Sequence, residues 1–128
     1  MLFSPCNAAG LRLLLALALL LIGWQAVTPS PLGPPGVNDK LLHALVFVGL
    51  AFLAEGGWPE RPFGWRSFAW LALYGGVLEV AQYFAPGRDA SLADLGADVA
   101  GLLVYSFVLG PWLRRRFGAA VRSGTPQP

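Results

Sequence analysis

Four apolar stretches, separated by short polar or proline-rich segments, dominate the pattern of the chain. They cover residues 11–27, 39–55, 68–84 and 92–113. A helix needs about 20 residues to cross about 30 Å of hydrocarbon. Because lipid offers no hydrogen bonds, a spanning segment must satisfy its backbone internally, which favours helices. The pattern therefore predicts an all-α fold, an integral membrane bundle of four transmembrane helices.

The connecting segments carry the residues that end helices. Residues 28–38 contain four prolines and two glycines, so they cannot continue a helix. The segment APGRDAS, residues 85–91, is short and similarly broken, so the third and fourth helices are expected to be antiparallel neighbours. We expect one domain over residues 1–128, ending in a disordered tail at 117–128.

The first stretch, residues 11–27, allows two interpretations. It is rich in leucine, with Gln25 as its only strongly polar residue, and Arg12 lies at its start. This composition fits a signal peptide as well as a membrane anchor. The sequence WQAVTPSP offers only a poor cleavage site. We therefore favour a retained helix, and cleavage stays open as the alternative.

Composition supports the membrane interpretation and argues against a nucleic-acid partner. Hydrophobic residues make up 55% of the chain and charged residues 12%, about half of what soluble domains carry. The positive surplus comes from Arg114–Arg116 with Arg122, which we interpret as an anchor at the membrane surface. The single cysteine, Cys6, excludes a disulfide within the chain.

The distribution of Lys and Arg predicts the orientation. Four spans place both termini on one side of the membrane, and cytoplasmic segments carry an excess of Lys and Arg. Seven of the nine basic residues fall on the side of the termini, and only Lys40 and Arg88 fall opposite. The seven are Arg12, Arg61, Arg66, Arg114, Arg115, Arg116 and Arg122. We therefore expect both termini to be cytoplasmic.

The same topology gathers polar residues at the outer ends of three helices. Several pairs are three or four residues apart, so each pair shares one helix face. Charged groups cost at least about 2.5 kcal/mol at the centre of a membrane helix, so they normally face the bundle interior. The sequence predicts a binding pocket there. Its residues are Asp39, Lys40, His43, Glu79, Gln82, Arg88, Asp94 and Asp98.

Some of these residues also have an ordinary structural explanation. Asp94 follows Ser91 by three positions before an apolar run, which is a capping-box pattern and our favoured interpretation of Asp94. Asn38 and Asp39 suggest a cap on the second helix. Lys40 and Arg88 fit interfacial cations equally well.

Other residues favour a function. Glu79 and Gln82 share one lipid-embedded face, and neither capping nor surface exposure accounts for them. We interpret this pair as functional. The neutral ring of His43 suits proton transfer or metal ligation at physiological pH. Glu79 and His43 are the candidate catalytic acid and base, should the protein be an enzyme.

The segments DKLLHALVF and LYGGVLEVAQYFAPGRDASLADLGADVAG resemble the VanZ-like family of small bacterial membrane proteins. The resemblance spans residues 39–101. Where that family usually has an asparagine, this chain has Asp98, which replaces an amide donor by a titratable acceptor. The residues that carry the resemblance are Asp39, Lys40, His43, Glu79, Gln82, Arg88, Asp94 and Gly101.

This resemblance implies a multi-pass protein of the bacterial inner (plasma) membrane. The family is named for a member that contributes to resistance against the glycopeptide teicoplanin. It implies no known reaction.

The charge balance of the outer pocket leads to three functional hypotheses. Its acids outnumber Lys40 and Arg88, so either some acids hold protons or a cation offsets them. The first hypothesis is a site that binds or modifies an envelope lipid headgroup or a lipid-linked wall precursor, with phosphate near the cations and helix N-termini. The acids counted at this end are Asp39, Glu79, Asp94 and Asp98 of the pocket and Asp89 in the turn, which we interpret as solvated.

The second hypothesis is a membrane-embedded enzyme on such a lipid, using Glu79 or His43 with a divalent metal as cofactor. The third is a small proton-coupled exporter. An exporter would need ionisable residues along its whole pathway. We expect none in the half of the bundle away from the outer pocket, which argues against export. The sequence leaves the oligomeric state open.

Overall fold

The computed structural model describes residues 5–29 and 36–117, which are helical apart from short turns. The last three helical segments follow one another without a break and form a single rod over Leu92–Phe117. The elements are α1 (Pro5–Val27), α2 (Asp39–Gly57), α3 (Trp65–Phe84), α4 (Leu92–Val104), the π-helical segment η1 (Tyr105–Leu109) and α5 (Gly110–Phe117). The prediction of an all-α fold is confirmed.

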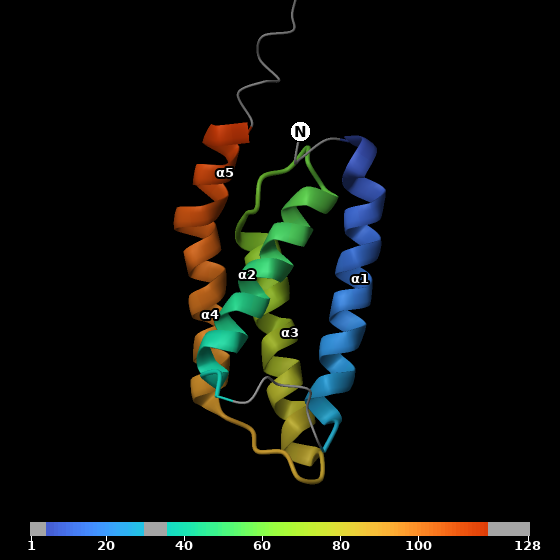
Figure 1. Cartoon of the computed structure of the whole chain (residues 1–128), viewed down its shortest axis with the longest axis vertical. Helices are drawn as coiled ribbons and strands as arrows, with labels where there is room; N and C mark the ends of the chain where they lie inside the picture. The colour runs from blue at the N-terminus through green and yellow to red at the C-terminus, as the bar shows by residue number, and fades with distance from the viewer. Residues whose placement is uncertain (1–4, 30–35, 118–128) are drawn as a thin grey trace, which may run out of the picture.

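The rods run antiparallel to their neighbours in sequence (Figure 1). Helix α2 contacts α1, α3 and α4, so it is the central element of the bundle. The start of α1 and the end of α5 lie together at one end, which we call the basic end (Figure 1). The start of α2, the end of α3 and the start of α4 lie at the other, which we call the acidic end (Figure 1).

Three helices are long and apolar enough to cross a membrane. They are Cys6–Val27, Asp39–Gly57 and Leu92–Phe117. Helix α3 is 20 residues long but is not among them, because aromatic and polar side chains such as Trp65, Glu79 and Gln82 lower its mean hydropathy. These helices indicate a membrane protein, and the fourth span stays a prediction.

Apolar packing fills the middle of the bundle. Phe47, Leu50 and Ala51 of α2 and Leu102 of α4 are each at most 2% exposed. Many large apolar side chains point away from the bundle instead, on all four rods. An exterior of this kind would be a liability in water but is expected of helices that face lipid.

Two glycines let the rods approach closely. A Cβ at Gly101 would overlap the carbonyl oxygen of Ala44, so α4 can meet α2 here only without a side chain. A Cβ at Gly75 of α3 would lie 2.9 Å from Oδ2 of Asp98. The missing side chain at Gly75 therefore makes room for the Asp98 carboxylate between α3 and α4.

Helix α1 is fixed to the bundle by polar contacts as well as by apolar packing. Nε of Arg12 donates to the carbonyl of Gly57 at 2.6 Å, at the end of α2. The hydroxyl of Tyr74, on α3, donates to the carbonyl of Leu19. The guanidinium of Arg12 also lies over the ring of Trp58, 5.0 Å from its centroid.

The π-helical segment η1 has a local cause. Pro111 has no N–H to donate to the carbonyl four residues earlier, and its ring would crowd that carbonyl. The Gly110 N–H donates instead to the carbonyl of Tyr105, five residues back. A Cβ at Gly110 would lie 2.9 Å from that same oxygen, so the wide turn favours glycine there.

Four predicted helix boundaries differ from the structure, since α2 continues two residues beyond Glu55 to Gly57, α3 begins at Trp65 rather than at Phe68, and the other two differ by more. The last rod was expected to end at Leu113, but it continues through Arg114–Arg116 to Phe117, because arginine favours helices and a cation suits a helix C-terminus. The first helix was expected from Leu11 but begins at Pro5, a residue that fits a first turn. Of the disordered tail predicted for residues 117–128, Phe117 is helical and the rest lies outside the described residues.

Candidate functional site

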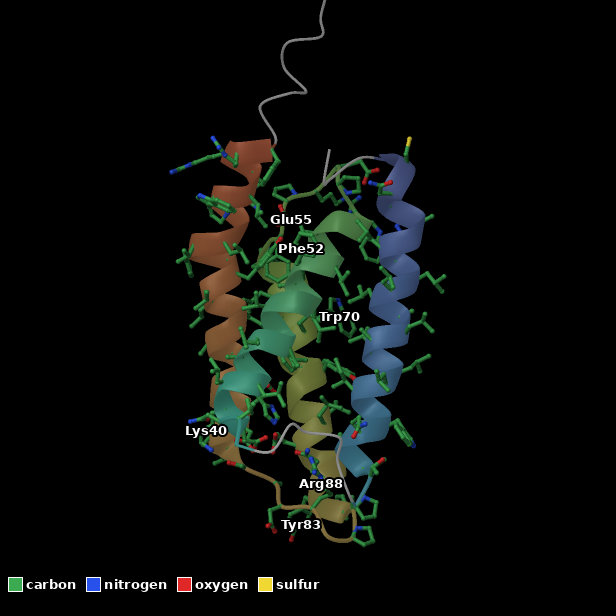
Figure 2. The ribbon with its side chains drawn as sticks, viewed as in Figure 1. Lys40, Phe52, Glu55, Trp70, Tyr83 and Arg88 are labelled. Atoms are coloured by element: carbon green, nitrogen blue, oxygen red, sulfur yellow. The ribbon has the colours of Figure 1, made fainter. Side chains whose placement is uncertain are left out.

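All the candidate site residues lie at the acidic end of the bundle. The first turns of α2 carry three of them, the last turns of α3 two, the turn after α3 one, and the first turns of α4 two. Figure 2 labels Lys40 and Arg88 at this end. The buried members are Glu79, Gln82, Asp94 and Asp98.

His43 contacts Asp98, the most buried of the acids that the structure describes. Nδ1 of His43 lies 2.9 Å from Oδ1 of Asp98, which is only 1% exposed. An ionised carboxylate can only accept a hydrogen bond, so it holds the His43 proton on Nδ1. The other ring nitrogen then stays free to take a proton or bind a metal.

Glu79 reaches across to the start of α4. Its Oε2 accepts from the backbone N–H of Ser91 at 2.7 Å. Ser91 is the N-cap of α4 and makes no side-chain cap bond. In a capping box, Asp94 would accept from this N–H. The predicted capping role of Asp94 is therefore wrong, because a carboxylate from another helix occupies the donor.

The carboxylate of Asp94 is engaged by α2 instead. Nζ of Lys40 lies 3.3 Å from Oδ1 of Asp94, while the Lys40 side chain stays 56% exposed. The predicted cap on α2 is confirmed, since the Asn38 side chain accepts from the N–H groups of Lys40 and Leu41.

Gln82 connects Glu79 to Arg88. With the amide assigned so that its oxygen faces Arg88, that oxygen accepts from Nη2 of Arg88 at 2.7 Å and its nitrogen donates to Oε1 of Glu79 at 3.3 Å. Nε of Arg88 is buried and has no hydrogen-bond partner in the described part of the chain. The Gln82 amide thus connects Arg88, in the turn between α3 and α4, to the carboxylate of Glu79. Asp89, in the same turn, is exposed.

Two sets of side chains at this end have metal-ligand spacing. One oxygen each of Glu79 and Asp98 and a ring nitrogen of His43 lie within 4.8 Å of one another. Asp39, His43 and Asp94 form a second set by the same measure. Both sets use the single histidine, so they are alternatives rather than neighbouring sites.

The sequence interpretation missed a second polar cluster, at the basic end. Glu55 of α2 is 4% exposed and accepts from the hydroxyl of Tyr105 at 2.7 Å and from Nη1 of Arg114 at 2.5 Å. The expectation that no ionisable residue marks that half of the bundle was wrong. The available signal was Tyr105, which continues the α4 face of Asp98 and Gly101 at helical spacing.

Comparison of the chain with models of known protein families, with curated proteins and with solved structures found no match. The resemblance to the VanZ-like family therefore depends on the residues of this chain alone.

Proposed function

We propose that this chain is a VanZ-like protein of the bacterial inner membrane that binds or modifies a lipid headgroup or a lipid-linked wall precursor. The pocket is the acidic end, facing outward. The proposal is carried by one observation: buried acids from α3 and α4 meet His43 of α2 beside Lys40 and Arg88. Burial of these charged groups costs free energy, and apolar packing of the helices does not require them.

Four spans with cytoplasmic termini are part of the proposal. Helix α3 is as long as α2 and packs against α1, α2 and α4, which supports a membrane span for it too. Among the described residues, every Arg and Lys other than Lys40 and Arg88 lies at the basic end. The positive-inside bias then places that end in the cytoplasm. The contacts of Arg12 and Leu19 support a retained α1.

The chemistry of the pocket suits a zwitterionic headgroup. Lys40 is exposed enough to meet a phosphate, and Arg88 can turn its unpartnered Nε toward one. Asp39 is exposed beside Lys40 and offers an oxygen to an amine. A headgroup that carries both phosphate and amine would therefore find both charges matched.

A second candidate is a membrane-embedded enzyme on the same class of lipid. The contact between His43 and Asp98 favours it, because a carboxylate that fixes the tautomer of a histidine is the usual support of a general base. Glu79 would act as the partner acid. No serine or cysteine in the described pocket lies beside a base in the way a nucleophile requires.

Proton-coupled export is a weaker third candidate. Glu55 and Arg114 do supply ionisable groups at the basic end. The fully buried layer of Phe47, Leu50 and Leu102 separates them from Asp98. A proton path would have to cross that layer.

The test compares cells that lack the protein with cells that carry Glu79→Gln. Envelope lipids, wall precursors and teicoplanin sensitivity are measured in each, and protein amounts are checked by immunoblot. We expect Glu79→Gln to match the deletion. Glu60→Gln, the same change at an exposed site of the basic end, should match the wild type. A wild-type profile for Glu79→Gln at normal protein amounts would refute the proposal.

A further inference from the structure

Two buried carboxylates at the acidic end have no lysine or arginine in an ion pair with them among the described residues. Of the buried acids described, Glu55 pairs with Arg114 and Asp94 pairs with Lys40. Glu79 and Asp98 make no ion pair with any Lys or Arg of the described residues. Buried charges in proteins are normally paired or bound to a metal. His43 is beside Asp98 and can balance at most one of the two charges, so the other needs a proton or a cation from outside the chain.

The geometry around them fits a cation. Oxygens of Glu79 and Asp98 and a ring nitrogen of His43 lie within 4.8 Å of one another. Three ligands at about 2.2 Å from one metal ion are at most about 3.8 Å apart, so the side chains must approach one another by up to about 1 Å to close the set. Each ligand comes from a different helix, and all three helices pack against one another.

The surroundings hold these ligands in place. Ser91 and Gln82 engage the two oxygens of Glu79, in the way that outer hydrogen bonds orient metal-ligating carboxylates. Gly75 leaves room for Oδ2 of Asp98, which lies there together with the ring of Phe47. Even an alanine at Gly75 would press on that oxygen.

We propose that His43, Glu79 and Asp98 bind one divalent transition-metal ion of the Zn²⁺ or Mn²⁺ class. The mixed nitrogen and oxygen set suits these ions, whereas Ca²⁺ and Mg²⁺ prefer oxygen alone. Three protein ligands leave a coordination position open, as in metal sites that bind a substrate. A headgroup phosphate oxygen would fill it. The inference rests on the site of the proposed function but not on its lipid.

The inner set is favoured over the set of Asp39, His43 and Asp94. Asp94 is already neutralised by Lys40, so metal binding there would have to compete with that ion pair. Asp39 is exposed to solvent, where ligation gains least. Among the described residues no Lys or Arg forms an ion pair with the inner set, whose only basic group is the His43 ring that would bind the metal, and it offers two buried carboxylates.

The experiment uses the full chain, purified in detergent with a tag that lacks histidine and treated with a chelator. Mn²⁺ alone is titrated in, and loss of the EPR signal of free Mn²⁺ reports binding. We expect one Mn²⁺ per chain, displaced by Zn²⁺. His43 is the only histidine, so histidine-nitrogen coupling in the pulsed EPR spectrum of bound Mn²⁺ assigns that ligand without a mutation.

Variants then separate the two sets. Glu79→Gln and Asp98→Asn should each weaken Mn²⁺ binding at least about tenfold, with helical content checked by circular dichroism. Asp89→Asn, an exposed acid nearby, is the control and should bind like the wild type. Absence of nitrogen coupling would overturn the proposal. A larger loss in Asp39→Asn than in Glu79→Gln would also overturn it.

The metal inference and the proposed function fail in different ways. A wild-type chain that binds no Mn²⁺ or Zn²⁺, while Glu79→Gln still alters envelope lipids, would refute the metal site and keep the headgroup proposal. Binding of one metal ion per chain, with an unchanged lipid and teicoplanin profile in Glu79→Gln cells, would refute the headgroup proposal and keep the metal site.

Discussion

Tyr105 belongs both to the apolar core and to the buried polar cluster at the basic end. Its ring is fully buried among apolar side chains and stacks edge-on against Phe63, with centroids 5.3 Å apart. Its hydroxyl meets Glu55, which Arg114 also contacts. The hydroxyl thus gives a buried carboxylate a second donor, where an unmet acceptor would be costly.

Removal of that hydroxyl tests the contact. Tyr105→Phe keeps the ring but leaves Oε2 of Glu55 without its donor, so we expect the free energy of unfolding to fall by about 1–3 kcal/mol. Denaturant unfolding of the purified chain in detergent measures it. Tyr83→Phe is the control, because Tyr83 is 74% exposed, and it should leave stability unchanged. Equal losses in both variants would contradict the assigned contact.

At the scale of residues, the sequence predicted which polar side chains lie at the same end of the bundle. It did not predict which of them form hydrogen bonds with one another. The sequence placed His43, Glu79 and Asp98 at one end because helix order and spacing fix their depth. It assigned Asp94 to a cap, since the local pattern contains no information that Glu79 would occupy the Ser91 N–H first. Glu55 was missed because a charge near a helix end resembles an ordinary interfacial residue.

At the scale of elements, the close approach of α2 and α4 depends on one missing side chain. The hydrophobic pattern predicted both helices and the residue at which each begins, Asp39 and Leu92, because a polar segment precedes each apolar run. It could not predict η1, which arises from Pro111 acting on carbonyls within the preceding turn. Nor could it show that Gly101 faces the backbone of Ala44.

Gly101→Ala should therefore separate α2 from α4 at this point. Its Cβ would run into the Ala44 carbonyl, and backbone cannot move aside as a side chain can. We expect a loss of about 1–3 kcal/mol in stability, seen as a lower melting temperature in detergent. Gly96→Ala, on the same helix and with nothing within 4 Å of its Cβ, is the matched control. It should be neutral or slightly stabilising.

At the scale of the whole molecule, charge is distributed unevenly between the two ends. At the basic end, arginines lie on α1, α3 and α5 and in the connection between α2 and α3. The acidic end carries four buried polar side chains, three of them acids, together with Lys40 and Arg88. This asymmetry was visible in the sequence, because it depends only on helix order. It makes the proposed orientation testable without knowledge of any substrate.

Cysteine labelling in intact cells tests that orientation. Cys6 is the only native cysteine, so Cys6→Ser provides a background without thiols. A single cysteine at Asp89 should react with a membrane-impermeant thiol reagent added outside, and one at Glu60 should react only after the membrane is opened. Both positions are exposed, so both can report. The opposite pattern would mean that the acidic end faces the cytoplasm.

The wide turn of η1 also decides where the chain can change in length. A π-helical turn holds one residue more than an α-helical turn, so loss of one residue from Tyr105–Leu109 would return the rod to regular α-helix and leave the side chains beyond it facing as before. Loss of one residue from α4, which is already α-helical, would instead turn every side chain beyond it by about 100° and move Arg114 away from Glu55. In a related chain that keeps the Glu55 and Arg114 pair, a one-residue deletion should therefore fall in η1 and not in α4.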